Sequence, residues 1–171
     1  MIYKFRMLSG EDKAFLRDYE IDAEDSFINL HKQIQNNLHF DSSQLASFFL
    51  TDEQWNKGLE LTLLDMRNDS GPVAIPMESI KITDLIKKRN QRLLYVYDIL
   101  TDNALFLELL DVFPAVKGVK YPICSASIGD APEQSIQDID EDNMTDESVD
   151  DILRNFEINE FGSEGYDGDD S

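Results

Sequence analysis

The uneven distribution of charge is the feature that most constrains the fold of this chain. Sixteen of its 35 acidic residues, but only one of its 15 basic residues, Arg154, lie between Asp130 and Ser171. That segment therefore carries −15 of the net charge of −20, and the residues before it carry −5. A segment that repels itself so strongly cannot bury enough apolar surface to fold alone. We expect a folded domain over residues 1–130 and an acidic, largely disordered tail over residues 131–171.

The first 40 residues predict a β-hairpin that leads into a helix. Apolar residues alternate with polar ones in residues 3–7 and 15–21, and turn-forming residues separate the two runs. A helix is then predicted from a cap at Asp25 or Ser26 to about His39, because its apolar residues recur every three or four positions. That apolar stripe consists of Phe27, Leu30, Ile34 and Leu38.

Further strands are predicted near residues 45–50, 59–63, 93–100 and 104–110, with a short helix that begins at Thr83 or Asp84. The last two of these strands are nearly continuous apolar runs, and the three residues between them favour a tight hairpin of central strands. Residues 121–124 predict a final edge strand or an extended segment, because Pro122 cannot donate within a ladder. This order predicts an α+β fold with a mostly antiparallel sheet and helices packed on one face.

Three segments resemble the signatures of the plasmid (agropine Ri plasmid) ORF-3-like family. They are residues 26–48, which contain a Leu-His pair and an Ile-Gln pair, the run Tyr95-Val96-Tyr97-Asp98 with Asp102 after it, and residues 129–133. Ile99 and Leu100 stand where the family has Phe-Gly, which marks a divergent member. The resemblance implies an α+β fold in which a β-hairpin enters a helix. It also implies an association with prokaryotic plasmids and insertion elements, and no established activity.

The composition bears on partners and location. A net charge of −20 opposes binding to a phosphate backbone, so we expect no direct nucleic-acid binding. The run Lys87-Lys88-Arg89 with Arg92 is a local exception, which is either a small basic face or a solvated helix end. No run of about 18 apolar residues occurs, so we expect no membrane partner. The single cysteine, Cys124, fits a reducing cytoplasm.

The most unusual polar group of the first 130 residues lies where a strongly apolar run ends. Asp98 closes that run after Tyr95 and Tyr97, and Asp102 follows in the spacer. The structural interpretation is that Asp98 ends a strand and accepts backbone N–H groups, while His31 is a buried, hydrogen-bonded imidazole. The functional interpretation is that these residues rim a pocket with His31. The structural interpretation is favoured, and the sequence predicts no catalytic group, metal ligand or cofactor.

The acidic tail contains one segment with helical spacing, near residues 148–157. Its apolar positions are Val149, Ile152, Leu153 and Phe156. Such a face inside an acidic frame is suited to docking in the groove of a protein partner, with a basic partner as one candidate. We therefore favour a non-enzymatic cytoplasmic protein-interaction module. The alternatives are a small-ligand binder or enzyme that uses the pocket near His31, and a DNA-mimic inhibitor. The oligomeric state is left open.

Overall fold

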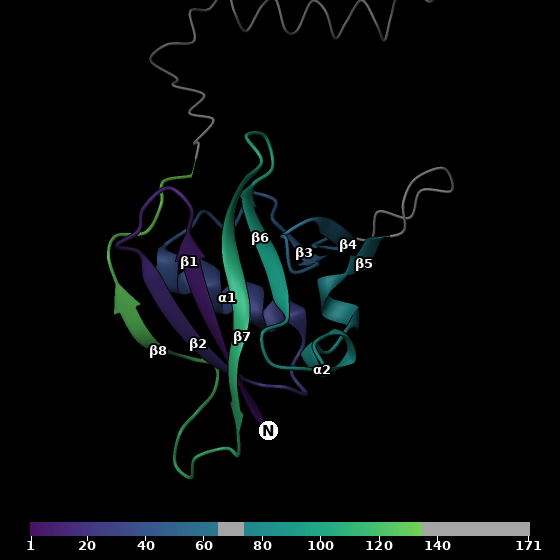
Figure 1. Cartoon of the computed structure of the whole chain (residues 1–171), viewed down its shortest axis with the longest axis vertical. Coiled ribbons are helices and arrows are strands. Elements are labelled where there is room, and N and C mark those ends of the chain that lie inside the picture. The colour runs from purple at the N-terminus through teal and green to yellow at the C-terminus, as the bar shows by residue number, and fades with distance from the viewer. Residues whose placement is uncertain (65–73, 135–171) are drawn as a thin grey trace, which may run out of the picture. The chain divides into compact units, whose positions relative to one another are not determined.

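The computed structural model describes residues 1–64 and 74–134 (Figure 1). Contacts divide the chain into two units, and every described residue belongs to the first, Met1–Ser135. The domain boundary expected near residue 130 stays a prediction. In chain order the elements are β1 (Ile2–Ser9), β2 (Leu16–Asp22), α1 (Phe27–Leu38), β3 (Ser47–Thr51), β4 (Lys57–Thr62), β5 (Ala74–Pro76), the 3-10 helix η1 (Met77–Ser79), α2 (Ile82–Leu85), β6 (Arg92–Asp98), β7 (Asn103–Phe113) and β8 (Ile123–Ile128).

The strands form one eight-stranded sheet in the order β5-β4-β3-β6-β7-β1-β2-β8. Every neighbouring pair is antiparallel except β4 and β5, which run parallel. The predicted opening hairpin is confirmed, with Phe5 opposite Tyr19. The edge strand expected near residue 123 is β8, which pairs with β2. The sequence did not predict β5, because three residues are too few to show an alternation.

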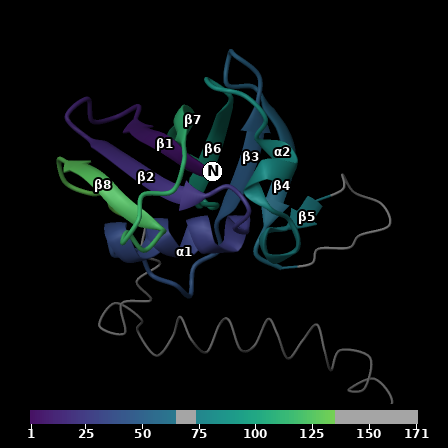
Figure 2. The ribbon, with the colours of Figure 1, turned by 90° about the horizontal axis from the view of Figure 1, so that it is seen from below.

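Helix α1 lies along one face of the curved sheet (Figure 2). All four residues of the predicted apolar stripe are buried, with exposures between 0 and 3%. The helix follows Ser26, which has an extended backbone, and ends at His39, which has the left-handed φ of 56°. The hydroxyl of Tyr3 on β1 donates to the carbonyl of Ile86 just after α2, at 3.0 Å. Both helices thus contribute to the core on this face, and the predicted α+β fold is confirmed.

The opposite face of the sheet carries a row of alternating charges. The strand register places Arg92 beside Glu108, Glu108 beside Arg6, and Arg6 beside Asp18. Asp18 is 2% exposed, and two nitrogens of Arg6 donate to its two oxygens at 2.9 Å each. The hydrogen bond to Asp18 raises the pKa of Arg6. Opposite charges on adjacent strands attract, so this row also favours the observed register.

Candidate functional site

His31 and Tyr95, two of the predicted site residues, meet in the core. Their side chains come from α1 and β6, and the Tyr95 hydroxyl lies 2.8 Å from Nδ1 of His31. Exposures are 3% for His31 and 0% for Tyr95. Burial, with a smaller contribution from the charge of Lys32, lowers the pKa of His31 to about 4. The histidine is therefore a neutral, buried and hydrogen-bonded imidazole, as the structural interpretation of the sequence predicts.

The other predicted residues of this group lie at the end of β6 and in the turn after it. Tyr97 shares the inner face with Tyr95 and stacks on Phe40, with ring centroids 5.2 Å apart. Asp98 is 3% exposed and accepts the backbone N–H of Thr101 at 3.3 Å. Asp102 is exposed in the turn and pairs with Lys57 at 2.7 Å. The structure thus brings His31 and Tyr95 together but spreads the five residues over the core, a strand end and a surface turn.

The second predicted site lies outside the described residues. It is the tail face formed by Val149, Ile152, Leu153 and Phe156, and the helical segment expected near residues 148–157 lies there too. The docking role of this face stays a prediction.

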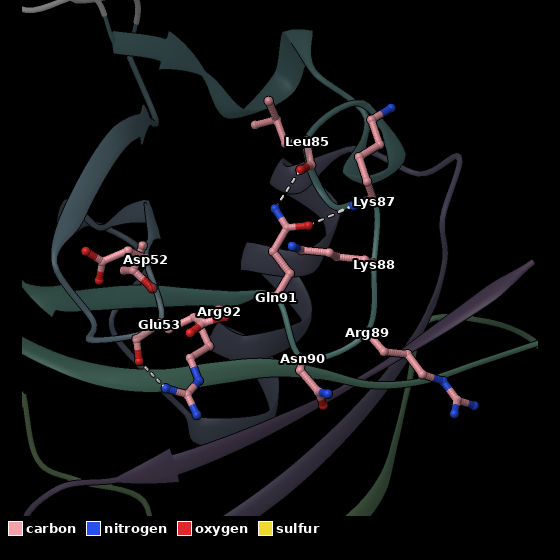
Figure 3. A pocket seen from close by; sticks show the side chains of 10 residues that line it. Asp52, Glu53, Leu85, Lys87, Lys88, Arg89, Asn90, Gln91 and Arg92 are labelled. Atoms are coloured by element: carbon pink, nitrogen blue, oxygen red, sulfur yellow. Dashed lines mark hydrogen bonds between the residues drawn. The ribbon is translucent and has the colours of Figure 1, made fainter.

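A basic cavity of about 610 Å³ opens between two connections of the described unit (Figure 3). One wall is the end of β3 and the turn toward β4, with Thr51, Asp52 and Glu53. The other wall is the connection from α2 to β6, residues 85–92. Volumes between about 300 and 1,000 Å³ are typical of ligand sites. The cavity is therefore large enough to receive a few side chains or a small molecule.

Gln91 shapes the wall of the basic cavity that carries the cations. Its side-chain amide donates to the carbonyl of Leu85 at 2.8 Å, and its Oε1 accepts the backbone N–H of Lys87 at the same distance (Figure 3). Asn90 has a left-handed φ of 67°, and its backbone N–H donates to the carbonyl of Leu109 on β7 at 2.9 Å. These bonds tie the connection to the sheet at one end and to α2 at the other.

The cations around this cavity differ in how far they are neutralised. Arg89 pairs with Asp111. Arg92 lies 4.0 Å from Glu108, and its guanidinium sits 4.8 Å from the ring centre of Trp55. Lys87 and Lys88 are both exposed and have no carboxylate partner within residues 1–64 and 74–134. Their two positive charges are therefore available to an anion.

Two polar groups on the facing wall bear on what the basic cavity accepts. Hydrogen bonds from the side chain and backbone of Asn56 lower the pKa of Asp52. That carboxylate thus stays charged and already has partners within its own turn. By contrast, the Oγ1 atom of Thr51 is buried and has no hydrogen-bond partner in the described part of the chain. Because this oxygen is enclosed, it forms part of the wall and offers no contact to a molecule in the cavity.

A second cavity, of about 320 Å³, lies where the β1–β2 turn, the end of β6 and the segment after β8 meet. Tyr97 lines it, together with four acidic residues, Glu11, Asp12, Asp130 and Glu133. We call it the tyrosine cavity. The sequence prediction named Tyr97 as a candidate but placed it in a pocket with His31. It did not anticipate the carboxylates, which come from the β1–β2 turn and from the segment after β8.

The basic cavity was only half predictable. The run of cations at residues 87–92 is visible in the sequence, and a small basic face is one of its two interpretations. The facing wall at residues 51–53 comes from a different hairpin, and no local pattern links the two. Among the described residues, no group of three acidic, histidine or cysteine side chains is arranged to hold a metal ion. In the same part of the chain, no helix has the length and hydrophobicity to cross a bilayer.

The chain was compared with known protein families, curated proteins and solved structures. Residues 2–167 match the family described as plasmid pRiA4b ORF-3-like protein. The fold is similar to the crystal structure of a protein of unknown function from Methanosarcina mazei Go1, with a TM-score of 0.62 and 22% sequence identity. That similarity covers 74% of this chain and 68% of the archaeal protein. No curated protein matches the chain.

Proposed function

The chain belongs to the plasmid pRiA4b ORF-3-like family, whose description names no reaction, and we propose that it is a non-enzymatic, cytoplasmic protein-interaction module. Its basic cavity binds an acidic segment of a partner protein. The observation that carries this proposal is the pair Lys87 and Lys88, two unneutralised cations at a cavity of about 610 Å³ on a chain of net charge −20. Elsewhere in the described unit, Lys4, Arg6, Lys57 and Lys81 face a carboxylate. Lys13, Lys32, Lys117 and Lys120 are exposed without such a partner among the described residues, but none of them lines this cavity.

The chemistry of the facing groups supports an acidic peptide over a nucleic acid. The carboxylates of a peptide pair with Lys87 and Lys88, while a backbone carbonyl accepts from the second N–H of the Gln91 side-chain amide. A nucleic acid would need a longer track of cations, because its affinity comes from several phosphate contacts at once. Distant acidic residues oppose the approach of any anion, but at physiological salt their effect decays over about 8 Å. Binding is thus expected to be short-ranged and to depend on the cavity itself.

The state of the titratable groups supports binding over catalysis. His31 and Tyr95, which have the chemistry to exchange a proton, are closed against each other in the core. Burial raises the pKa of the Cys124 thiol, which makes it a weaker nucleophile at neutral pH. A free thiol is also consistent with a cytoplasmic location. Among the described residues, the carboxylates of the open sheet face alternate with cations instead of forming rows, which does not favour a DNA mimic.

The acidic tail has a separate place in this proposal. Its apolar positions, Val149, Ile152, Leu153 and Phe156, would dock in a groove of a partner, and the surrounding carboxylates would speed association with a basic surface. This part rests on the sequence alone. A partner protein with an acidic segment that binds the basic cavity and a basic groove that binds the tail would fit both parts of the proposal.

A binding assay with matched charge changes tests the cavity. The probe is a fluorescein-labelled peptide of eight alternating glutamate and serine residues, and the readouts are its anisotropy and the fluorescence of Trp55, the single tryptophan, whose ring contacts Arg92. We expect the double variant Lys87→Glu/Lys88→Glu to raise the Kd at least about tenfold, since two charge-assisted contacts become repulsive. The matched control, Lys117→Glu/Lys120→Glu, changes the net charge equally at exposed positions between β7 and β8.

The control decides between the cavity and the overall charge. If both double variants weaken binding equally, the peptide responds to net charge and the cavity has no special role. If wild type does not bind the peptide but binds inorganic phosphate or citrate with a change in Trp55 fluorescence, the alternative of a small-ligand site replaces the proposal. Its supporting observation is the cavity volume, which suits a small anion equally well.

A further inference from the structure

The tyrosine cavity has properties opposite to those of the basic cavity. Its volume is about 320 Å³, and its lining contains Glu11, Asp12, Asp130 and Glu133. None of these four carboxylates forms an ion pair with a residue in the described ranges 1–64 and 74–134. No basic side chain lines this cavity. The cavity therefore concentrates negative potential at one end of the sheet.

Tyr97 is buried as a residue, but its hydroxyl stays accessible where the residue lines this cavity. The residue is 4% exposed, and its ring is fixed by stacking on Phe40. Its hydroxyl has no hydrogen-bond partner among the described residues, although Tyr3, Tyr19 and Tyr95 on the same inner face each have one. Burial, with the charges of Glu11 and Asp98, raises the pKa of Tyr97, so the hydroxyl stays protonated. A neutral phenol in this position is able to accept a hydrogen bond from a ligand.

The wall on the side of β8 is held rigidly by Arg17. This residue is 5% exposed and lies behind the cavity, where its guanidinium donates to the carbonyls of Ile128 and Gly129 at 2.7 and 2.8 Å. Gly129 has a φ of 78°, and a Cβ atom there would lie 2.7 Å from the carbonyl oxygen of Ala14. The segment that presents Asp130 and Glu133 is therefore anchored to β2 and the turn before it, which is how a preformed site is built.

The geometry points to an organic cation as the ligand. We propose that the tyrosine cavity binds a primary ammonium or guanidinium group, which donates to the Tyr97 hydroxyl and is neutralised by the surrounding carboxylates, Glu11 above all. The carboxylates surround the space without converging as a three-ligand cluster. This arrangement suits a delocalised or multiply donating cation better than a compact metal ion.

This site is independent of the basic cavity, because the two cavities share no lining residue. Two sources of the cation are distinguished by the probe. Agmatine represents a free small amine, and a capped tripeptide with arginine between two glycines represents a basic side chain of a protein. Tighter binding of agmatine indicates a small-molecule site, and tighter binding of the tripeptide indicates a protein partner. Both outcomes support the cavity, provided that the variants below respond.

The experiment must separate binding at this cavity from the weak attraction that 35 acidic residues exert on any cation. The variant Tyr97→Phe separates the two effects, because it removes the hydroxyl, keeps the ring and leaves the net charge unchanged. We expect Tyr97→Phe to raise the Kd of the bound probe about tenfold, the usual effect of losing one hydrogen bond to a charged group. Glu11→Gln should weaken binding similarly. By contrast, Glu78→Gln, which changes an exposed carboxylate in η1, should change the Kd less than twofold.

Calorimetry gives the Kd, and amide NMR spectra of the full chain locate the probe. The proposal is overturned if Tyr97→Phe binds as wild type does, or if Glu11→Gln and Glu78→Gln have equal effects. Should Tyr97→Phe fail to fold, wild type alone decides. Shifts confined to the amides of residues 9–12 and 129–133 support the site, and shifts spread over the acidic residues in general refute it.

Discussion

Lowering the pH should destabilise this protein through His31 before most other groups contribute. The imidazole is 3% exposed, faces the Tyr95 hydroxyl and has a pKa of about 4, below its ordinary 6.5. In the unfolded chain the same histidine takes up its proton near pH 6.5. Between these two values the unfolded state binds more protons than the folded state. The free energy of unfolding must therefore fall as the pH falls through this window.

The magnitude follows from the size of the pKa shift. Each unit of pKa difference corresponds to about 1.4 kcal/mol, so a shift from 6.5 to about 4 removes about 3 kcal/mol once both states are protonated. Most of this loss, roughly 2 kcal/mol, occurs between pH 7 and pH 4.5. A domain of this size is stable by about 5 to 15 kcal/mol in total, so the loss is large enough to measure.

Urea denaturation at half-unit intervals from pH 7.5 to 4.5 measures the effect. The carboxylates contribute their own pH dependence, so the informative quantity is the difference between wild type and His31→Gln, which cannot titrate but can still bond to Tyr95. We expect the variant to be less stable at pH 7 and to lose about 2 kcal/mol less on acidification. His39→Asn replaces the other histidine, which is exposed, and is the matched control for the substitution of a histidine. Parallel curves for wild type and His31→Gln would refute the reasoning.

Two further predictions concern a close backbone contact beside the sheet and an ion pair on its open face. Gly129→Ala should destabilise the fold by about 2 kcal/mol or more, because its Cβ would lie 2.7 Å from the Ala14 oxygen. Gly118→Ala, also at positive φ but with open space around it, should lose only about 1 kcal/mol. Equal urea midpoints for the two variants would contradict this expectation. Arg6→Met should destabilise by about 2 kcal/mol, because it leaves the buried Asp18 carboxylate with Lys4 alone, at 3.9 Å. A thermal unfolding midpoint unchanged from wild type would show that solvent satisfies Asp18.

The sequence by itself determined the elements that have a local cause. The stripe of α1 is visible because residues three or four apart share a face of any helix, and its burial followed as predicted. The β1–β2 hairpin is visible because its alternating runs lie close together in the chain, with turn residues between them. The alternation in β1 also indicates which side chains face the core. These features depend on neighbours in sequence, so one sequence is enough to detect them.

The tertiary structure decided which distant residues share a site. Tyr97 is a candidate from its place in an apolar strand, but its cavity is formed with Glu11 in the β1–β2 turn and Glu133 in the segment after β8, both far from it in sequence. Likewise, Lys87 and Lys88 form a cavity only because β6 pairs with β3 and brings Thr51 to face them. The order of strands in a sheet is set by the packing of the whole core, and periodicity contains no information about it. Charges and hydroxyls from separate connections therefore come together because of the strand order, which no local sequence pattern predicts.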